Sequence, residues 1–407
     1  MHRFDKLSSI LDKIAEWSLY LMIFVLPFAK SIVEITIVTG LVSLVLKKII
    51  VKERMFSTTS VDIFLYMFLI ASLISLFNTS YLGLSLRAFF SKSLKFALLF
   101  FITKEIINTR EKIKNLTAMA LLSCAIILVD GFIQYFFTHE DLLHKYPSFK
   151  YFAPEPFFLG FPTASFPFPN DFAAWILIFI FPIGIFTFLK NNGWKQRAIT
   201  AVIFIGLSYS LILTKVRGAW LGFLIAFGFL SAFKMKKLGI VLLVIFISAA
   251  LLINKALIPD ILSFTSVSDR STMWKNSWEI FKKHPIIGNG LNTFYVNYEK
   301  VRNDEFKNKK GSYAHNCYLQ MAAEIGLLGL IAFLCFIVAL FRKAIVALKN
   351  IKDPLYNSIA MGLIFGILAF LVHSFFDTNL YSLNLSALFW LSSGFLISVI
   401  NAAKKVS

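Results

Sequence analysis

The sequence predicts an all-α, polytopic membrane protein, a helical bundle with about 12 transmembrane helices. Hydrophobic residues make up 58% of its 407 residues and charged residues only 15%, whereas soluble domains are about 25% charged. Many apolar stretches approach or exceed the roughly 20 residues that cross a bilayer as a helix. Lys and Arg gather in short connectors between these stretches, as is typical of cytoplasmic loops.

A single membrane domain is expected to cover residues 1–407. The basic connectors fall on alternate sides of successive spans, together with both termini, so both termini are expected in the cytoplasm. The first apolar stretch lacks a small-residue cleavage site, and we expect it to be a span rather than a removed signal. The expected spans lie near residues 15–29, 31–47, 61–78, 85–103, 115–137, 169–189, 197–214, 217–233, 238–254, 316–341, 354–376 and 383–402.

A long loop on the outer side is expected at residues 255–315, between the ninth and tenth spans. It holds ten Lys or Arg residues, more than the positive-inside rule places on that side. Attraction to an anionic substrate would explain this excess.

An aromatic helix is predicted inside this loop. Trp274, Trp278 and Phe281 recur at i, i+4 and i+7, so they form one helical face that suits the bilayer interface. Pro285 is expected to end this helix, and the "GNG" stretch at 288–290 is expected to form a turn.

The formal net charge of +19 follows from basic membrane loops, so we expect no nucleic-acid partner. Three cysteines are too few and too scattered for a disulfide framework or a cysteine zinc site. They are Cys124, Cys317 and Cys335.

Ionisable groups near a bilayer are costly, so those expected on the outer side are the functional candidates. Each also has a structural alternative: cations at helix ends can extend to the interface, a loop arginine can be solvated, and a lone histidine is more often structural. For the aspartate we favour the structural alternative, hydrogen bonding within a turn. The candidates are Arg87, Lys215, Arg217, Arg270, His315, His373 and Asp377.

His315 opens the tenth predicted span. In a continuous helix Gly326 would lie on nearly the same face, with Ala322 close to this line, and such a stripe of small residues suits close helix packing. Glu324 would fall nearly opposite His315 and deeper, so we expect a buried polar anchor rather than a partner of the histidine.

Several kinds of chemistry are disfavoured by the motifs. The sequence has no Asp-x-Asp pair on the expected outer side, no His-Glu-x-x-His and no phosphate-binding loop of the GxxxxGK[ST] type. We therefore expect neither a metal nor a cofactor. Arginines bind diphosphates through paired, charge-assisted hydrogen bonds, and histidine accepts protons near neutral pH.

Three stretches match the motifs of one known family. "RGAWL" fits Arg-x-x-x-Leu, and "DRSTMWKNSWEIFKKHPIIGNGLNTF" has the Arg, Trp, Pro, Gly-x-Gly and Phe of a characteristic loop in the same order. "HNCYLQMAAEIGLLG" fits His-[Asn/Ser/Gln]-x9-Gly-x-x-[Gly/Thr/Tyr] through His315, Asn316, Gly326 and Gly329. In these stretches the chain resembles the bacterial O-antigen ligases, within the superfamily of O-antigen ligases and polymerases.

The resemblance implies a polytopic inner-membrane glycosyltransferase with a periplasmic active site. Its donor would be a glycan on undecaprenyl diphosphate, its acceptor the lipid A–core oligosaccharide, and its surroundings membrane lipids. His315 would take or orient the proton of the acceptor hydroxyl, while Arg217 and Arg270 would hold the departing diphosphate in an inverting transfer. The further substrate-binding residues that we expect are Lys215, Arg87, Trp274, Asn316, His373 and Asp377.

Three alternatives stay open. A polymerase of the same superfamily would transfer the glycan to another lipid-linked repeat unit. A transporter or flippase would place charges at the midplane on broken helices, and an inactive scaffold would leave the outer arginines and histidine replaceable.

Overall fold

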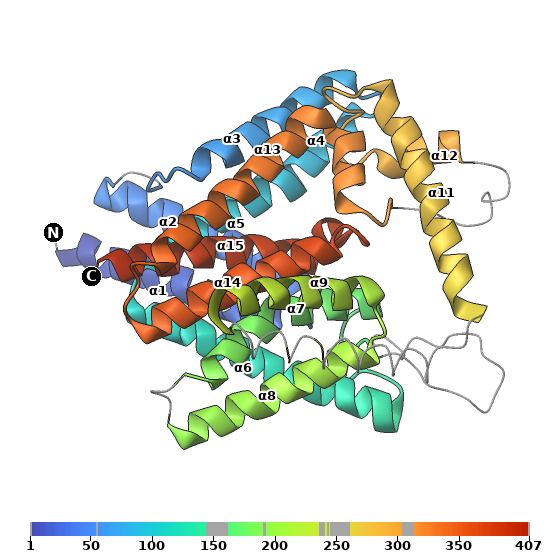
Figure 1. The fold of residues 1–407 in the computed structure, drawn as a ribbon. Helices are drawn as coiled ribbons and strands as arrows, with labels where there is room; N and C mark the ends of the chain where they lie inside the picture. The colour runs from blue at the N-terminus through green and yellow to red at the C-terminus, as the bar shows by residue number, and fades with distance from the viewer. Residues whose placement is uncertain are drawn as a thin grey trace.

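A computed structural model describes residues 2–53, 56–143, 162–189, 193–235, 241, 244, 261–302 and 313–405. These residues form helices joined by short turns, with no β-strand among them (Figure 1). The all-α prediction is therefore confirmed.

The principal helices occupy almost the whole described chain. Short 3-10 or π-helical turns extend or join several of them, as at Phe89–Leu94 between α4 and α5. The helices are α1 (His2–Val25), α2 (Lys30–Val51), α3 (Asp62–Ile74), α4 (Leu82–Ala88), α5 (Lys95–Ile106), α6 (Arg110–Ile133), α7 (Pro169–Thr187), α8 (Trp194–Leu213), α9 (Arg217–Leu230), α11 (Ile261–Lys283), α12 (Phe294–Val301), α13 (Cys317–Leu348), α14 (Pro354–His373) and α15 (Leu383–Lys404).

Eleven of the twelve predicted spans coincide with helical segments, and the ninth, 238–254, falls almost wholly outside the described residues. Six described helices are long and apolar enough to cross a membrane. That the chain crosses the membrane twelve times stays a prediction. The six are Arg110–Thr138, Pro169–Thr187, Trp194–Leu213, Cys317–Leu348, Pro354–His373 and Leu383–Lys404.

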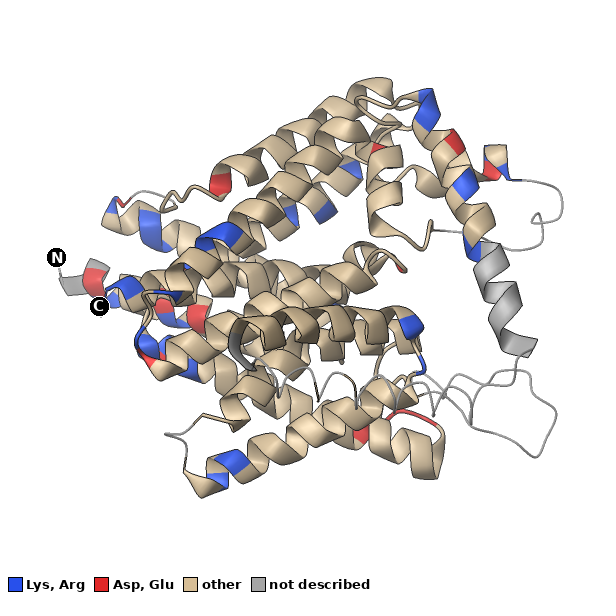
Figure 2. Ribbon diagram, viewed as in Figure 1, with Lys and Arg blue, Asp and Glu red and all other residues tan. Residues whose placement is uncertain are grey.

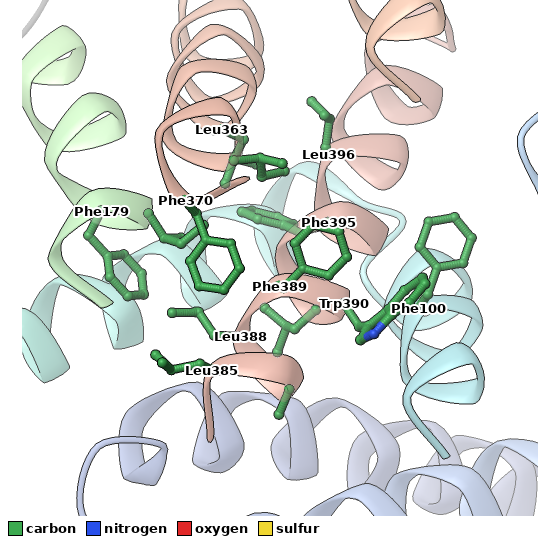
Figure 3. Packing of buried hydrophobic residues seen from close by; sticks show 14 of the residues in the cluster. Phe100, Phe179, Leu363, Phe370, Leu385, Leu388, Phe389, Trp390, Phe395 and Leu396 are labelled. Atoms are coloured by element: carbon green, nitrogen blue, oxygen red, sulfur yellow. The ribbon is translucent and has the colours of Figure 1, made fainter. Parts of the chain in front are cut away.

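Helices α14 and α15 lie at the centre of the bundle. Helix α14 packs against α7 and α9, and α15 packs against α5. Aromatic side chains fill the space between them, with Phe370 stacked on Phe389 and Trp390 beside Phe100 (Figure 3). The apolar side chains of α15 face protein along nearly its whole length.

The two chain termini lie at one end of the bundle, and α11 and α12 lie at the other (Figure 1). Most Lys and Arg lie near these ends and on α11, and a few lie partway along the α4–α5 segment (Figure 2). Both α11 and α12 belong to the predicted loop at 255–315, whose periplasmic location stays a prediction. The end that carries them is called the loop end below.

Helix α13 is not the continuous helix that the sequence predicts. It begins at Cys317, after an Asn316 N-cap, and it breaks at Gly326, where φ is 68°. His315 does not lie above Gly326 on one helical face, and this prediction is wrong, because His315 precedes the helix and has a left-handed φ of 48°.

A non-helical segment, residues 285–290, inserts at this break. In an unbroken helix the N–H groups of Leu327 and Leu328 would bond to the carbonyls of Ala323 and Glu324. Instead they donate to the carbonyls of residues 285 and 286, at 2.8 and 3.1 Å, and the freed carbonyls accept from the N–H groups of residues 289 and 290, at 3.1 and 2.8 Å. Four bonds replace two, as a broken helix within a bilayer requires.

The stripe of small residues expected for helix packing therefore has a different neighbour. Gly326 faces the backbone of Ile286, and Ala322 packs in a small cluster with side chains of α11 and α12. The predicted C-terminal end of the aromatic helix is confirmed, because α11 stops at Lys283, two residues before Pro285. The predicted turn is also present, with positive φ angles at Gly288 and Gly290.

Candidate functional site

A histidine and an aspartate from two different segments pair at the loop end. Nδ1 of His315 lies 3.1 Å from Oδ1 of Asp377, and the two residues are 62 positions apart in the chain. The His315 side chain is 39% exposed and that of Asp377 is 12% exposed. The histidine is thus open to a substrate while its partner lies behind it.

Two further hydrogen bonds fix the aspartate. The side-chain amide of Asn170 donates to its Oδ2, and the backbone N–H of Thr378 donates to its Oδ1 at 2.7 Å. Burial alone would raise the pKa of the Asp377 carboxyl, but the hydrogen bond from His315 and the charges of His315 and His373 hold that pKa well below its usual range. Asp377 is therefore ionised at neutral pH.

An ionised carboxylate only accepts hydrogen bonds, so the Nδ1–H of His315 is the donor. This contact selects the tautomer in which Nε2 carries the free lone pair. The turn role that we favoured for Asp377 is present in the bond from Thr378, and the pairing with His315 is a second role. The pair is arranged for proton acceptance at Nε2.

His373 lies behind this pair, at the C-terminal end of α14. Its ring is buried, its Nε2 is 3.4 Å from the carbonyl oxygen of Asn170, and its Nδ1 has no hydrogen-bond partner. All the contacts shown for this ring are with protein, and its expected role in substrate binding stays a prediction.

Two of the predicted arginines lie around the same end of α14. Arg270, on α11, is half-buried and close enough for its charge to act on His373. Arg217 is the exposed first residue of α9, and the next residue, Gly218, packs against His373 and Phe376. Side chains of His315 and Asp377 thus share this end of the bundle with two guanidinium groups.

The remaining candidates differ in their surroundings. Lys215 occupies the turn before α9 with a left-handed φ of 53°, and burial lowers the pKa of its ammonium group. Arg87 is exposed in the last turn of α4, and no contact described for it reaches the histidine–aspartate pair.

Trp274 and Asn316 have clear structural contacts. The ring of Trp274 meets Phe375 edge to face at 5.6 Å between centroids, and Phe281 is buried. The aromatic face of α11 is therefore mostly covered by protein, and only Trp278 is half exposed. Asn316 is buried, and its Oδ1 caps α13 by accepting from the N–H groups of Tyr318 and Leu319.

Glu324 is the buried anchor that the sequence predicts. Its Oε2 accepts from the N–H of Asn292 at 2.8 Å, and its Oε1 accepts from the N–H of Phe294 at 3.3 Å. It therefore ties α13 to the loop rather than to another membrane helix. In the described part of the chain, no group of three or more His, Cys, Asp or Glu side chains could hold a metal ion.

Sequence reasoning missed Asn170 and Gln320. Asn170 lies 207 positions from Asp377, and its only local signal is its place after Pro169 at the start of α7. Gln320, on the first turn of α13, accepts from the N–H of Ala314 at 3.1 Å. A buried glutamine one turn before Glu324 is the only sequence signal for it.

Together these features define a polytopic helical membrane protein with a histidine–carboxylate pair beside arginines at one end of its bundle. Residues 200–334 match a family model described as O-antigen ligase. The match covers about a third of the chain and includes Arg217, Arg270 and His315. The resemblance read from the sequence motifs is thus confirmed over this segment, which is similar to the O-antigen ligase family.

A curated relative gives a consistent result. A protein of Rickettsia felis named "Putative polysaccharide ligase" is 26% identical over 245 residues, which cover 56% of this chain. The chain spans about half the length of this relative, 54%. Both comparisons support the superfamily of O-antigen ligases and polymerases.

Proposed function

We propose that the protein is an O-antigen ligase of the bacterial inner membrane. It transfers a glycan from undecaprenyl diphosphate to the lipid A–core oligosaccharide at the periplasmic face. The observation that carries the proposal is the pairing of His315 with the ionised Asp377 at the end of α14 where Arg217 and Arg270 also lie. The name of the Rickettsia relative favours a ligase over a polymerase.

The reaction is a single displacement at the anomeric carbon of the donor sugar. The acceptor hydroxyl oxygen forms the new glycosidic bond while the bond from the anomeric carbon to the diphosphate oxygen breaks, which inverts the configuration. Nε2 of His315 takes the hydroxyl proton, and Asp377 stabilises the resulting imidazolium. The bonding electrons leave with the diphosphate.

The departing diphosphate needs cations rather than a proton. Guanidinium groups hold phosphate oxygens in a planar fork, and Arg217 and Arg270 reach the loop end from two sides, α9 and α11. Fixed positive charge at this point stabilises the charge that grows on the leaving group. Lys215 and Arg87 add to the positive potential that attracts the donor.

The test is glycan transfer by single variants that reach the membrane in normal amounts. We expect His315→Ala to lower the rate about 10²- to 10⁴-fold and Arg217→Ala or Arg270→Ala about 10²- to 10³-fold. His284→Ala and Arg302→Ala alter a histidine and an arginine of the same loop region, outside the site, and are expected to keep wild-type rates.

A strain that lacks its own ligase supplies the second measurement. Expression of the wild-type chain is expected to place glycan on lipid A–core there. Longer lipid-linked glycan without any on lipid A–core would instead identify a polymerase. Normal transfer by His315→Ala would remove the histidine from the mechanism.

A further inference from the structure

A buried polar cluster connects the loop to the backbone beside His315. It consists of Lys92 at the π-helical turn between α4 and α5, Asn292 in the loop, and Glu324 and Gln320 on α13. Nζ of Lys92 donates to Oδ1 of Asn292 at 2.7 Å, and the N–H of Asn292 donates to Oε2 of Glu324 at 2.8 Å. Asn292 thus links Lys92 to the carboxyl group of Glu324, and the three segments are distant from one another in the chain.

From the carboxylate the cluster continues toward the site. Nε2 of Gln320 donates to Oε1 of Glu324 at 3.3 Å, and Oε1 of Gln320 accepts from the N–H of Ala314 at 3.1 Å. Nε2 of Gln320 is the group that donates to Glu324, so this bond fixes which end of the Gln320 amide faces the carboxyl group. The carbonyl end is then turned toward Ala314, whose neighbour is His315.

Two residues held by this cluster have left-handed backbones, Asn292 with a φ of 57° and His315 with a φ of 48°. Such conformations are uncommon for residues other than glycine and persist where surrounding contacts impose them. The bonds to Asn292 and Ala314 are contacts of this kind.

Packing alone does not hold Glu324 in place. A cavity of about 70 Å³ borders Lys92, Asn292, Glu324 and Tyr381, a volume that would hold several water molecules. Since the side chains have room to move on this side, the hydrogen bonds are what set the geometry.

We propose that Glu324, acting through Gln320, is a positioning residue for His315. The cluster holds the turn at 313–316 so that the imidazole keeps its contact with Asp377 and presents Nε2 to the acceptor. This role rests on the proposed function for its effect on rate. Its effect on the backbone at 313–316 is independent of that function.

Glu324→Gln is the main test, because it keeps the size of the side chain but replaces an acceptor by a donor. Oε1 and Oε2 together serve three donors, so an amide at this position loses at least one bond. When the new amide nitrogen faces Gln320, the Gln320 amide must turn to present its oxygen. Gln320→Leu removes the bond to Ala314 directly and serves in the same way if the first variant does not accumulate. Glu299→Gln, an exposed change on α12, is the matched control.

Kinetics separate positioning from stability. With purified protein we expect either variant to lower kcat about 10- to 100-fold and to change the donor KM less than about twofold. In a His315→Ala background the same change is expected to have no further effect, since residues that act as a unit are not additive. A wild-type kcat per folded molecule, or full additivity with His315→Ala, would overturn the proposal.

Hydrogen exchange gives a readout without activity. The backbone amides of residues 313–316 are expected to exchange faster in both variants than in the wild type. In the Glu299→Gln control their exchange rates are expected to match the wild type. If exchange speeds up while His315→Ala keeps normal transfer, the proposed function fails but the positioning contact stands. Unchanged exchange at 313–316 in both variants contradicts the positioning role itself.

Discussion

His315 is a candidate base because its ring is hydrogen-bonded to the buried, charged carboxylate of Asp377. Four groups act on this carboxylate: the His315 ring, the Asn170 amide, the Thr378 N–H and, through its charge, His373. A neutral histidine in water favours the tautomer with the proton on Nε2, whereas here the contact with Asp377 holds the proton on Nδ1 and leaves Nε2 open. The chemistry assigned to His315 therefore depends on a residue outside its own motif.

Asp377→Asn is expected to lower kcat about 10- to 100-fold and to leave the donor KM nearly unchanged. The amide keeps the shape of the carboxyl group but cannot stabilise an imidazolium by charge. Initial rates of transfer at saturating donor, per folded molecule, measure this effect. A wild-type kcat would contradict the pairing.

The pH dependence of stability provides the check on the charge of Asp377. A depressed carboxyl pKa stabilises the fold above the unfolded pKa, about 3.9, and this contribution is lost as the pH falls through the folded value. The stability advantage of the wild type over Asp377→Asn is thus expected to persist from pH 8 down to pH 5. Thermal unfolding in detergent over this range tests it, and a loss of the advantage near pH 6 would contradict it.

At the scale of elements, the loop and the broken helix α13 form one unit. Segment 285–290 supplies the hydrogen bonds that the helix lacks at Gly326, and Asn289 adds side-chain bonds from its Nδ2 to the carbonyls of Ile280 and Ala323, at 3.0 and 2.9 Å. This joint connects α11, which carries Arg270, with α13, which follows His315. The joint explains Gly326 and Gly288, since a side chain at either position would meet the backbone of the other segment.

Gly326→Ala is expected to reduce the free energy of unfolding by at least the roughly 1–3 kcal/mol of a strained backbone conformation. A side chain there would meet the carbonyl oxygen of Ile286 at 2.2 Å, and φ is in the left-handed region. Thermal stability in detergent measures the loss.

Gly83→Ala, on α4, is the matched control. A side chain at this position meets nothing within 4 Å, so we expect no loss and at most about 1 kcal/mol of gain from helix propensity. Equal stability of the two variants would mean that α13 tolerates a continuous helix.

At the scale of the whole molecule, a buried ion pair that stabilises the fold and the candidate site lie at opposite ends of the bundle. Near the end that holds the termini, Lys104 forms a fully buried ion pair with Asp62 at 2.8 Å and lies over the ring of Phe101. The histidine–aspartate pair lies past the C-terminal end of α14, at the loop end of the bundle. Changes at one end are therefore expected to leave the other intact.

Lys104→Met is expected to cost about 3–5 kcal/mol of unfolding free energy, because it leaves the Asp62 charge buried and unpaired. The kcat of the protein that remains folded is expected to match the wild type. Lys282→Met, which breaks the exposed pair with Glu279, should cost less than about 1 kcal/mol. A loss of kcat in Lys104→Met at normal stability would show that the two ends are coupled.

The sequence by itself determined the helical class, eleven helical segments near the predicted spans, and the residues of the histidine and arginine motifs. These follow from local properties, since the apolar length that crosses a bilayer and the Asn, Asp or Pro at a helix start are read along the chain. Only the tertiary structure decided that Asp377 contacts His315 and Asn170, and that α13 breaks to accept segment 285–290. Those contacts join residues 34 to 207 positions apart, and the packing of helices against one another, rather than any local pattern, sets them.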